Sequence, residues 1–228
     1  MNPEPDDLTM AGLRFSGTVT AAFTHDFKNA LAIIKENTGL LQDLLAMAER
    51  GRPLDPERIA VLAERIGRQV ERANRMTSQL NRFAHSADTP RVETDLATMI
   101  EMAAVLAGRK AALKRVTLET VPPATASRVS TFPFALQHLL YRCIESLLDG
   151  AGSGGRIVLE VHGAQDPVTL RLTACTADGR PPFDAAAPSV TPEMAALAGA
   201  LKIRVDWEQT AGWTLAWNDA GPQKAAGL

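Results

Sequence analysis

The chain has 228 residues, of which 46% are hydrophobic and 22% charged, and its net charge at pH 7 is −2. This length suits one large or two small globular domains. The near-neutral charge argues against a protein that binds nucleic acid over its whole surface. No apolar run reaches the roughly 20 residues that a membrane-spanning helix needs.

The chain ends and the cysteines indicate the compartment. The first ten residues are acidic and contain two prolines, unlike a signal peptide. The two cysteines, Cys143 and Cys175, both lie in apolar segments, where they are expected to be reduced thiols. We therefore expect a cytoplasmic protein with flexible tails at residues 1–12 and 219–228.

The first domain is expected to cover residues 13–85 as two long helices. The segment RGRPLDP separates a helix from about Leu13 to Glu49 from a second helix from about Pro56 to Ala84. The inward-facing residues of the second helix recur at spacings of three or four: Ile59, Leu62, Ile66, Val70, Ala73, Met76 (or Thr77), Leu80 and Phe83. Because an antiparallel hairpin buries both apolar stripes poorly by itself, two hairpins are expected to pair as a homodimeric four-helix bundle.

His25 is the candidate catalytic residue of the first helix. At about 100° per residue, the apolar side chains fall opposite His25: Phe23, Phe27, Ala30, Ile34, Leu41 and Leu45. His25 should therefore face solvent, as either an idle surface histidine or a nucleophile. Asp26 can accept the Nδ1 proton, which would leave Nε2 basic, and Asn29 is one turn away. An imidazole in that tautomer can attack phosphorus and carry the phosphoryl group.

A linker at residues 86–93 is expected to lead into a second domain at 94–218. The patterns predict a helix capped by Thr94, a strand in KRVTLETV, a helix over 132–148, strands in RIVLEVHG and VTLRLTAC joined at QDP, a helix over 191–200, and a hairpin of KIRVDWEQ and GWTLAWN. This order predicts an α/β sandwich with helices on one face of a mixed sheet. GAGSGG at 150–155 has no following Lys-Ser or Lys-Thr, so it is interpreted as a plain turn.

The segment HDFKNALAIIKENTGLL resembles the H-box of sensor histidine kinases. VERANRMTSQLNRFAH is similar to the second helix of their dimerisation and histidine-phosphotransfer domain, and the second half is similar, element by element, to their ATP-binding domain. The resemblance implies an α+β chain, with a dimeric four-helix bundle followed by a kinase-ATPase-like α/β sandwich. It implies that His25 is phosphorylated, with Asp26 and Asn29 as its helpers. Ala30 stands where kinases often have proline, so the helix should be straighter.

The positions that bind ATP in that family carry other residues here. The helical asparagine that holds Mg²⁺ is expected in LLYRCIESLLD, where the polar pair falls on Arg142 and Ser146. The Asp-x-Gly-x-Gly turn aligns with ADGRPPF, which places Ala177 and Pro181 at its aspartate and second glycine. Serine is a poor Mg²⁺ ligand and arginine repels the ion. We expect no ATP binding, no metal site and no autokinase activity, a combination that resembles the dimeric histidine phosphotransferases.

The resulting hypothesis is a phosphorelay histidine phosphotransferase. Response-regulator receiver domains and an upstream hybrid kinase are its expected partners, and the receiver supplies Mg²⁺. Lys28 and Glu36 are candidates to contact the partner or the phosphoryl oxygens. Two other functions remain open: a receiver phosphatase in which Asp26 and Asn29 position water, and a non-catalytic dimeric adaptor.

The remaining charged residues and histidines admit a second interpretation. Eight arginines and four acidic residues lie between Arg50 and Arg82. They form either a solvated helix face or a surface that attracts an acidic receiver. A single aromatic residue in the second helix argues against nucleic acid as the partner. His85 is expected to end the second helix, where a cation suits the helix dipole, and His138 and His162 are interpreted as structural.

Overall fold

The structure, a computed structural model, describes residues 5–88, 90–121, 123, 125–163, 168–182, 187–209 and 212–217. It divides into two compact units: Ser16–His85, and the described residues before Ser16 together with those after His85. Within the described part, no helix combines the length and apolar character that crossing a bilayer requires.

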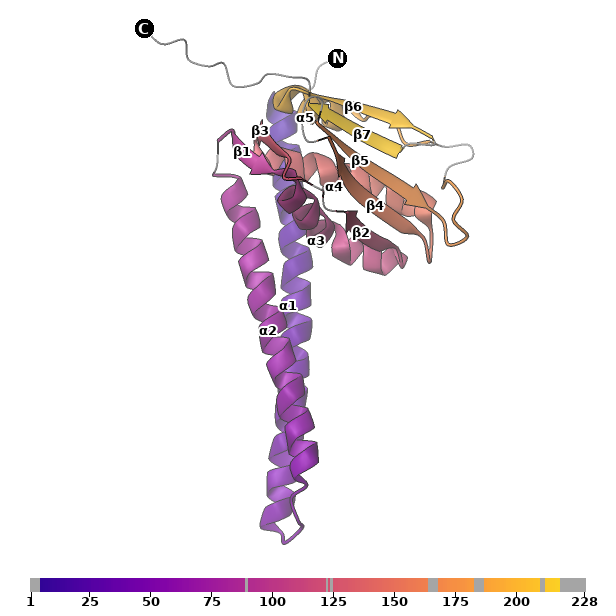
Figure 1. Cartoon of the computed structure of the whole chain (residues 1–228). Coiled ribbons are helices and arrows are strands. Elements are labelled where there is room, and N and C mark those ends of the chain that lie inside the picture. Colours follow the sequence, from indigo (N-terminus) through magenta and orange to yellow (C-terminus); the bar gives the residue numbers. More distant parts are fainter. Residues whose placement is uncertain are drawn as a thin grey trace. The chain divides into compact units, whose positions relative to one another are not determined.

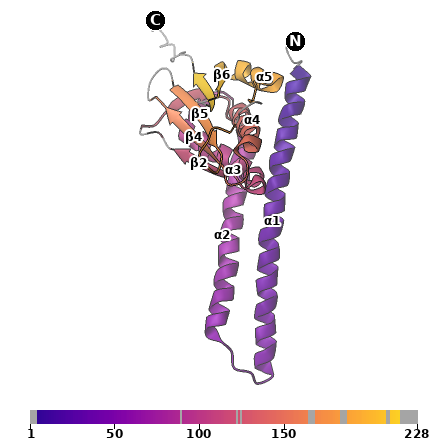
Figure 2. The same ribbon diagram turned by 90° about the vertical axis from the view of Figure 1, so that its right-hand side faces the viewer.

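The first unit is an antiparallel helical hairpin (Figures 1 and 2). It is built from most of helix α1 (Pro5–Glu49) and of helix α2 (Pro56–Ser86). The part of α1 before Ser16 belongs to the second unit. The Asp55 carboxylate accepts the Glu57 amide at 3.0 Å and so caps α2. The prediction of a helical hairpin is confirmed. The predicted start of the first helix was wrong, because α1 begins at Pro5 rather than near Leu13. Residues 5–12 are therefore helical rather than a flexible tail.

The hairpin core is a narrow line of side chains. Its buried members are Val19, Phe23, Ala30 and Asn37 on α1 and Leu62, Met76 and Phe83 on α2. Val70 was predicted to join this line but is exposed, while Gln69 is half-buried in its place. The reason is spacing, because the buried positions of α2 recur every seven residues from Leu62, and Val70 stands one residue past that line.

The second unit is an α/β sandwich. In chain order its elements are β1 (Val92–Asp95), α3 (Leu96–Lys114), β2 (Thr117–Val121), β3 (Arg128–Thr131), α4 (Pro133–Ala151), β4 (Arg156–His162), β5 (Val168–Cys175), α5 (Pro192–Leu201), β6 (Ile203–Glu208) and β7 (Gly212–Trp217). Five strands form one sheet in the order β2-β4-β5-β7-β6. Strands β2 and β4 are parallel and the other neighbours are antiparallel. The predicted mixed sheet with its helices is confirmed.

The core of this unit lies between α4 and the sheet. Strand β4 alternates, with Ile157, Leu159 and Val161 buried on one face. Helix α4 buries most of its length, as its near-continuous apolar sequence predicts. Both cysteines are free, and burial raises the pKa of the Cys143 thiol, so it stays protonated as an apolar filler.

Two features of this unit differ from the sequence prediction. Asp95, not Thr94, caps α3, because its carboxylate accepts the Ala97 amide at 2.9 Å. Thr94 instead lies in β1, which pairs with β3 as a separate two-stranded sheet. Neither short strand was predicted, and residues 92–93 were placed in the linker. The predicted turn at QDP and the tail at 219–228 lie outside the described residues.

The GAGSGG stretch is the turn between α4 and β4, as predicted. Gly155 donates its amide to the Gly152 carbonyl at 3.1 Å and accepts the Thr117 amide at 2.9 Å. A Cβ on Gly155 would lie 2.2 Å from the Ala151 carbonyl oxygen, so only glycine fits this crossing. The glycines therefore serve backbone packing here.

Candidate functional site

His25 lies in the middle of α1 with its ring turned toward solvent. Its side chain is 49% exposed, whereas Phe23 and Ala30, on the opposite face of the helix, are buried. The predicted orientation therefore agrees with the structure. About half of the His25 side chain is thus accessible to another protein.

Two neighbouring side chains converge on Nδ1 of His25. The Asn29 amide nitrogen is 3.1 Å from Nδ1, and the Asp26 carboxylate oxygen Oδ1 is 3.5 Å from it. Both come from one turn of the same helix, at i+4 and i+1, which is why a local sequence motif can build the arrangement. The protein's own groups thus engage Nδ1, and Nε2 lies on the far side of the ring.

The Asn29 amide is coupled to the tautomer of His25. With the amide nitrogen toward the ring, Nδ1 accepts a hydrogen bond and the proton of the neutral ring is on Nε2. A half-turn of the amide presents its oxygen, and Nδ1–H can then donate to Asn29 and to the Asp26 carboxylate. The second arrangement leaves a lone pair on Nε2.

Lys28 and Glu36, the other two candidate contact residues, are both exposed on α1. Glu36 directly precedes the buried Asn37, and Lys28 lies on the outermost line of the helix. Neither touches His25 through any hydrogen bond or ion pair within the described residues. Their position therefore suits contact with a partner rather than with the resting imidazole.

The hairpin has one side without charged residues, here called the uncharged side. On α1 it consists of Thr20, Thr24, Phe27, Leu31, Ile34, Thr38, Leu41, Leu45 and Ala48. On α2 it consists of Ala60, Ala63, Gly67, Val70, Asn74, Thr77, Asn81 and Ala84. Seven of the nine α1 residues and all eight α2 residues directly follow a buried or half-buried position, whereas Leu41 and Ala48 follow the exposed Leu40 and Met47 near the turn. In antiparallel helices such flanks lie on the same side of the pair. Leu31 and Leu45 are 59% and 55% exposed there.

His25 lies away from the uncharged side. It directly precedes the half-buried Asp26, and Asn29 directly precedes the buried Ala30, so both belong to the opposite flank of α1. A second molecule could cover the exposed leucines without covering the imidazole.

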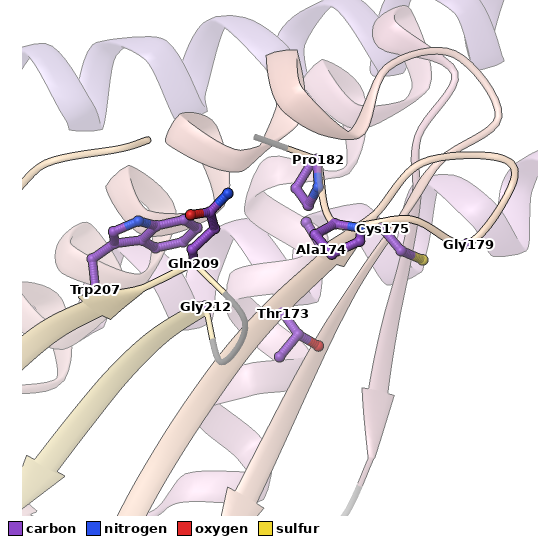
Figure 3. A pocket seen from close by; sticks show the side chains of 9 residues that line it. Thr173, Ala174, Cys175, Gly179, Pro182, Trp207, Gln209 and Gly212 are labelled. Atoms are coloured by element: carbon purple, nitrogen blue, oxygen red, sulfur yellow. The ribbon is translucent and has the colours of Figure 1, made fainter. Parts of the chain in front are cut away.

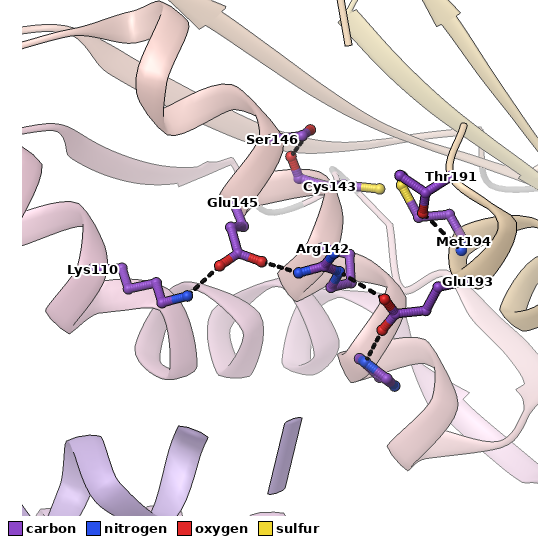
Figure 4. Close-up of polar contacts among 9 residues, drawn as sticks. Lys110, Arg142, Cys143, Glu145, Ser146, Thr191, Glu193 and Met194 are labelled. Carbon is purple, nitrogen blue, oxygen red and sulfur yellow. Dashed lines mark hydrogen bonds and ion pairs between the residues drawn. The ribbon is translucent and has the colours of Figure 1, made fainter. Parts of the chain in front are cut away.

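In the α/β unit, protein groups engage the two helical positions Arg142 and Ser146 (Figure 4). Arg142 forms ion pairs with Glu145 and, at 3.3 Å, with Glu193 of α5. The Ser146 hydroxyl donates to the Cys143 carbonyl at 2.8 Å and accepts the Trp213 indole N–H at 2.9 Å. These contacts make both side chains part of the packing between α4 and its neighbours.

The turn that aligns with the Asp-x-Gly-x-Gly pattern is closed by its own residues. The Thr176 hydroxyl bonds to the Asp178 carboxylate, which also pairs with Arg180 at 3.0 Å. Ala177 lies against Gly154, with 3.1 Å between its Cβ and a Cβ built on that glycine. Asp178, the one acidic residue of this turn, is therefore already paired.

Pro181 lines a small cavity next to this turn. The cavity is bounded by the end of β5 and by Trp207 and Gly212 (Figure 3). The cavity has a volume of about 140 Å³. Sites for drug-sized ligands usually measure about 300–1,000 Å³. Of the four aligned positions, Pro181 lines this cavity, and Arg142, Ser146 and Ala177 are not among its lining residues in the described part of the chain.

His138 is buried in the α/β unit, as a structural histidine should be. Its Nε2 lies 2.8 Å from the Glu193 carboxylate, and its ring stacks on Phe15 with 4.5 Å between centroids. Burial lowers the pKa of His138, and the nearby Arg142 adds to this effect, while the Glu193 and Glu145 carboxylates oppose it. His162 pairs with Glu160 at 3.1 Å.

Sequence reasoning missed the residues that contact Arg142 and Ser146. Glu193 comes from α5 and Trp213 from β7, about 50 and 70 positions after Arg142 and Ser146. Their contacts depend on tertiary packing, so no local spacing signals them. The arrangement around His25 could be predicted because His25, Asp26 and Asn29 lie within about one helical turn.

Comparisons with known proteins gave structural similarity only. No protein-family model and no curated protein matches the sequence. The fold is similar to that of histidine kinase AdeS of Acinetobacter baumannii, with 13% identity, a TM-score of 0.44, and coverage of 82% of this chain and 97% of that one. It is also similar to a histidine kinase of Burkholderia phymatum, with 12% identity, a TM-score of 0.46, and coverage of 92% of this chain and 98% of that one. A third similar structure is a bacterial phosphotransferase, with 15% identity, a TM-score of 0.41, and coverage of 90% of this chain and 95% of that one. Similarities at this level identify neither catalytic residues nor an activity.

Proposed function

We propose that the chain is a phosphorelay histidine phosphotransferase, which passes a phosphoryl group between receiver-domain aspartates through His25. One observation carries the proposal: an imidazole that is half exposed, with Nδ1 held by Asp26 and Asn29 and Nε2 directed away from them. The H-box resemblance assigns phosphorylation to the same residue.

In the first step, Nε2 of His25 attacks the phosphorus of a receiver's aspartyl phosphate. An N–P bond forms, the P–O bond to aspartate breaks, and the receiver's carboxylate leaves with the electron pair. The proton stays on Nδ1, where the Asp26 carboxylate balances the positive charge of the ring and Asn29 accepts a hydrogen bond. Reversal on a second receiver returns the imidazole, so no water or added reductant is consumed.

The receiver supplies the Mg²⁺ that neutralises the phosphoryl oxygens, and this chain contributes the nucleophile and its orientation. We include in the proposal that the chain lacks ATP-dependent autokinase activity. The contacts of Arg142 with Glu193 and of Ser146 with Trp213 support this, because a nucleotide would have to displace protein partners. The prediction is that calorimetry detects no binding of magnesium-ATP.

We further propose a homodimer in which two hairpins pair through their uncharged sides. The partly exposed Leu31 and Leu45 support this arrangement, because pairing would remove them from water. His25 then stays on the outer surface of the resulting four-helix bundle, and each dimer offers two phosphorylation sites.

The experiment that tests the function mixes the protein with a panel of phosphorylated receiver domains and follows the label. Acid-labile, base-stable label on the wild type and none on His25→Ala is the expected result. Receivers that lose phosphate without labelling the protein would indicate a phosphatase. A His25→Ala variant that retains the biological output would indicate an adaptor. Either result would replace the proposed function.

A further inference from the structure

A row of arginines on α2 has no part in the chemistry described above. Its positions are separated alternately by three and four residues, and each directly precedes an inward-facing residue. They are Arg58, Val61, Arg65, Arg68, Arg72, Arg75, Gln79 and Arg82, here called the arginine row. All six arginines are exposed. Arg68 pairs with Glu64, whereas the other five form no ion pair within the described residues.

The arginine row and His25 lie on the same side of the hairpin. Both belong to the flank that precedes the inward-facing positions, and in antiparallel helices these two flanks share one side. Counting about 1.5 Å per residue from the turn that joins Glu49 to Pro56 places His25 level with about residue 80. Arg72, Arg75 and Arg82 therefore lie within about 12 Å of His25 along the hairpin axis.

The composition of the row fits carboxylate recognition. Helix α2 contains no lysine, so every positive charge of the row is a guanidinium, which binds carboxylates through two parallel hydrogen bonds. The uncharged side of the same helix carries no arginine at all. An even distribution of charge would be expected if the arginines only kept the helix in solution.

We propose that Arg72, Arg75 and Arg82 are the docking surface for the acidic face of the receiver that exchanges phosphate with His25. The inference rests on the proposed function and names where its partner binds. A docking patch of about 800 Å² per partner is about 30 Å across, enough to cover both His25 and these arginines. The aspartyl phosphate and the Mg²⁺-binding carboxylates make a receiver negative around its active site, complementary to the row.

The local acidic residues do not cancel this charge. Glu57, Glu64 and Glu71 lie on the outermost line of α2, and of these only Glu64 is paired with an arginine of the row. On α1, Glu36 and Asp43 share the side of His25 but form no ion pair with α2 within the described residues. The guanidinium groups near His25 are thus available to a partner.

The test compares two triple variants with equal loss of charge. Arg72→Gln/Arg75→Gln/Arg82→Gln removes the part of the row near His25. Arg50→Gln/Arg52→Gln/Arg58→Gln removes three exposed arginines about 30 Å or more away, near the turn. The donor is the phosphorylated receiver that labels the wild type fastest. We expect kcat/KM for label transfer to fall roughly tenfold in the first variant and about twofold or less in the second, with the difference shrinking at high salt.

A small phosphoryl donor separates docking from chemistry. Phosphoramidate should label His25 equally in the wild type and both variants, because it needs no docking surface. Equal transfer from the receiver to both variants, or a loss of phosphoramidate labelling in the first, would overturn the inference while leaving the proposed function intact. The inference would also be overturned if the first variant accepted phosphate from the receiver at the wild-type rate but no longer bound phosphatidylserine vesicles or duplex DNA. The arginines would then serve a membrane or a nucleic acid instead of a receiver. If no receiver labels the wild type, the proposed function fails, and this inference fails with it.

Discussion

Replacing Leu31 and Leu45 by lysine should convert the proposed dimer into a monomer. Full burial of a leucine side chain contributes about 1.5–3 kcal/mol. Because Leu31 and Leu45 are still 59% and 55% exposed as residues, each has about 1–1.5 kcal/mol left to gain from burial. Four leucines per dimer give about 4–6 kcal/mol, so their loss should raise the dimer dissociation constant by about a thousandfold or more.

The matched control is Ala32→Lys/Ala46→Lys, which introduces the same charges at the same spacing, one residue further along the helix. Both alanines are exposed and belong to the flank of His25. Size-exclusion chromatography with multi-angle light scattering should give a dimer mass for the wild type and the control, and a monomer mass for the leucine variant. A leucine variant that remains dimeric, or a control that dissociates, would refute the placement of the interface on the uncharged side.

Three further predictions concern stability, measured by urea unfolding. Because burial lowers the pKa of His138, the native state binds fewer protons than the unfolded chain below about pH 6.5. The free energy of unfolding should therefore decrease as the pH is lowered below that value, and His138→Gln should make this pH dependence weaker. An unchanged pH dependence in the variant would contradict this. Asn37→Leu should stabilise by about 1 kcal/mol, since Asn37 Oδ1 is buried without a partner in the described residues, and destabilisation would reveal one. Gly155→Ala should destabilise by about 2 kcal/mol or more, whereas Gly108→Ala in α3 of the same unit, with no atom near its Cβ, should not.

The sequence was sufficient for the long helices and for the strands with clear alternation, but it missed the start of α1 and the short strands β1 and β3. The orientation of His25 follows from the 3.6-residue period of α1, and the mixed sheet follows from alternating strands. The cap of α3 was misplaced by one residue because Thr94 and Asp95 are both good capping residues. Only the pairing of β1 with β3 shows which of them ends a strand.

Features that depend on packing between distant segments could not be predicted. Val70 and Gln69 are adjacent, and the apolar side chain of Val70 makes it the expected inward-facing residue. Which residue faces α1 is decided by the register between the two helices. Likewise, Arg142 and Ser146 were recognised as unusual at a nucleotide site, but their partners Glu193 and Trp213 come from α5 and β7. The sequence identifies the unusual residues at these two positions, while only the fold shows which side chains contact them.

The central claim is that Nε2 of His25 accepts the phosphoryl group, because Asp26 and Asn29 hold Nδ1. The most direct measurement is NMR of the ¹⁵N-histidine-labelled protein after phosphorylation by a receiver, with phosphorus couplings identifying the ring nitrogen. The account predicts phosphorus on Nε2 of His25 and on no other residue. Phosphorus on Nδ1, on another side chain, or on none would contradict it.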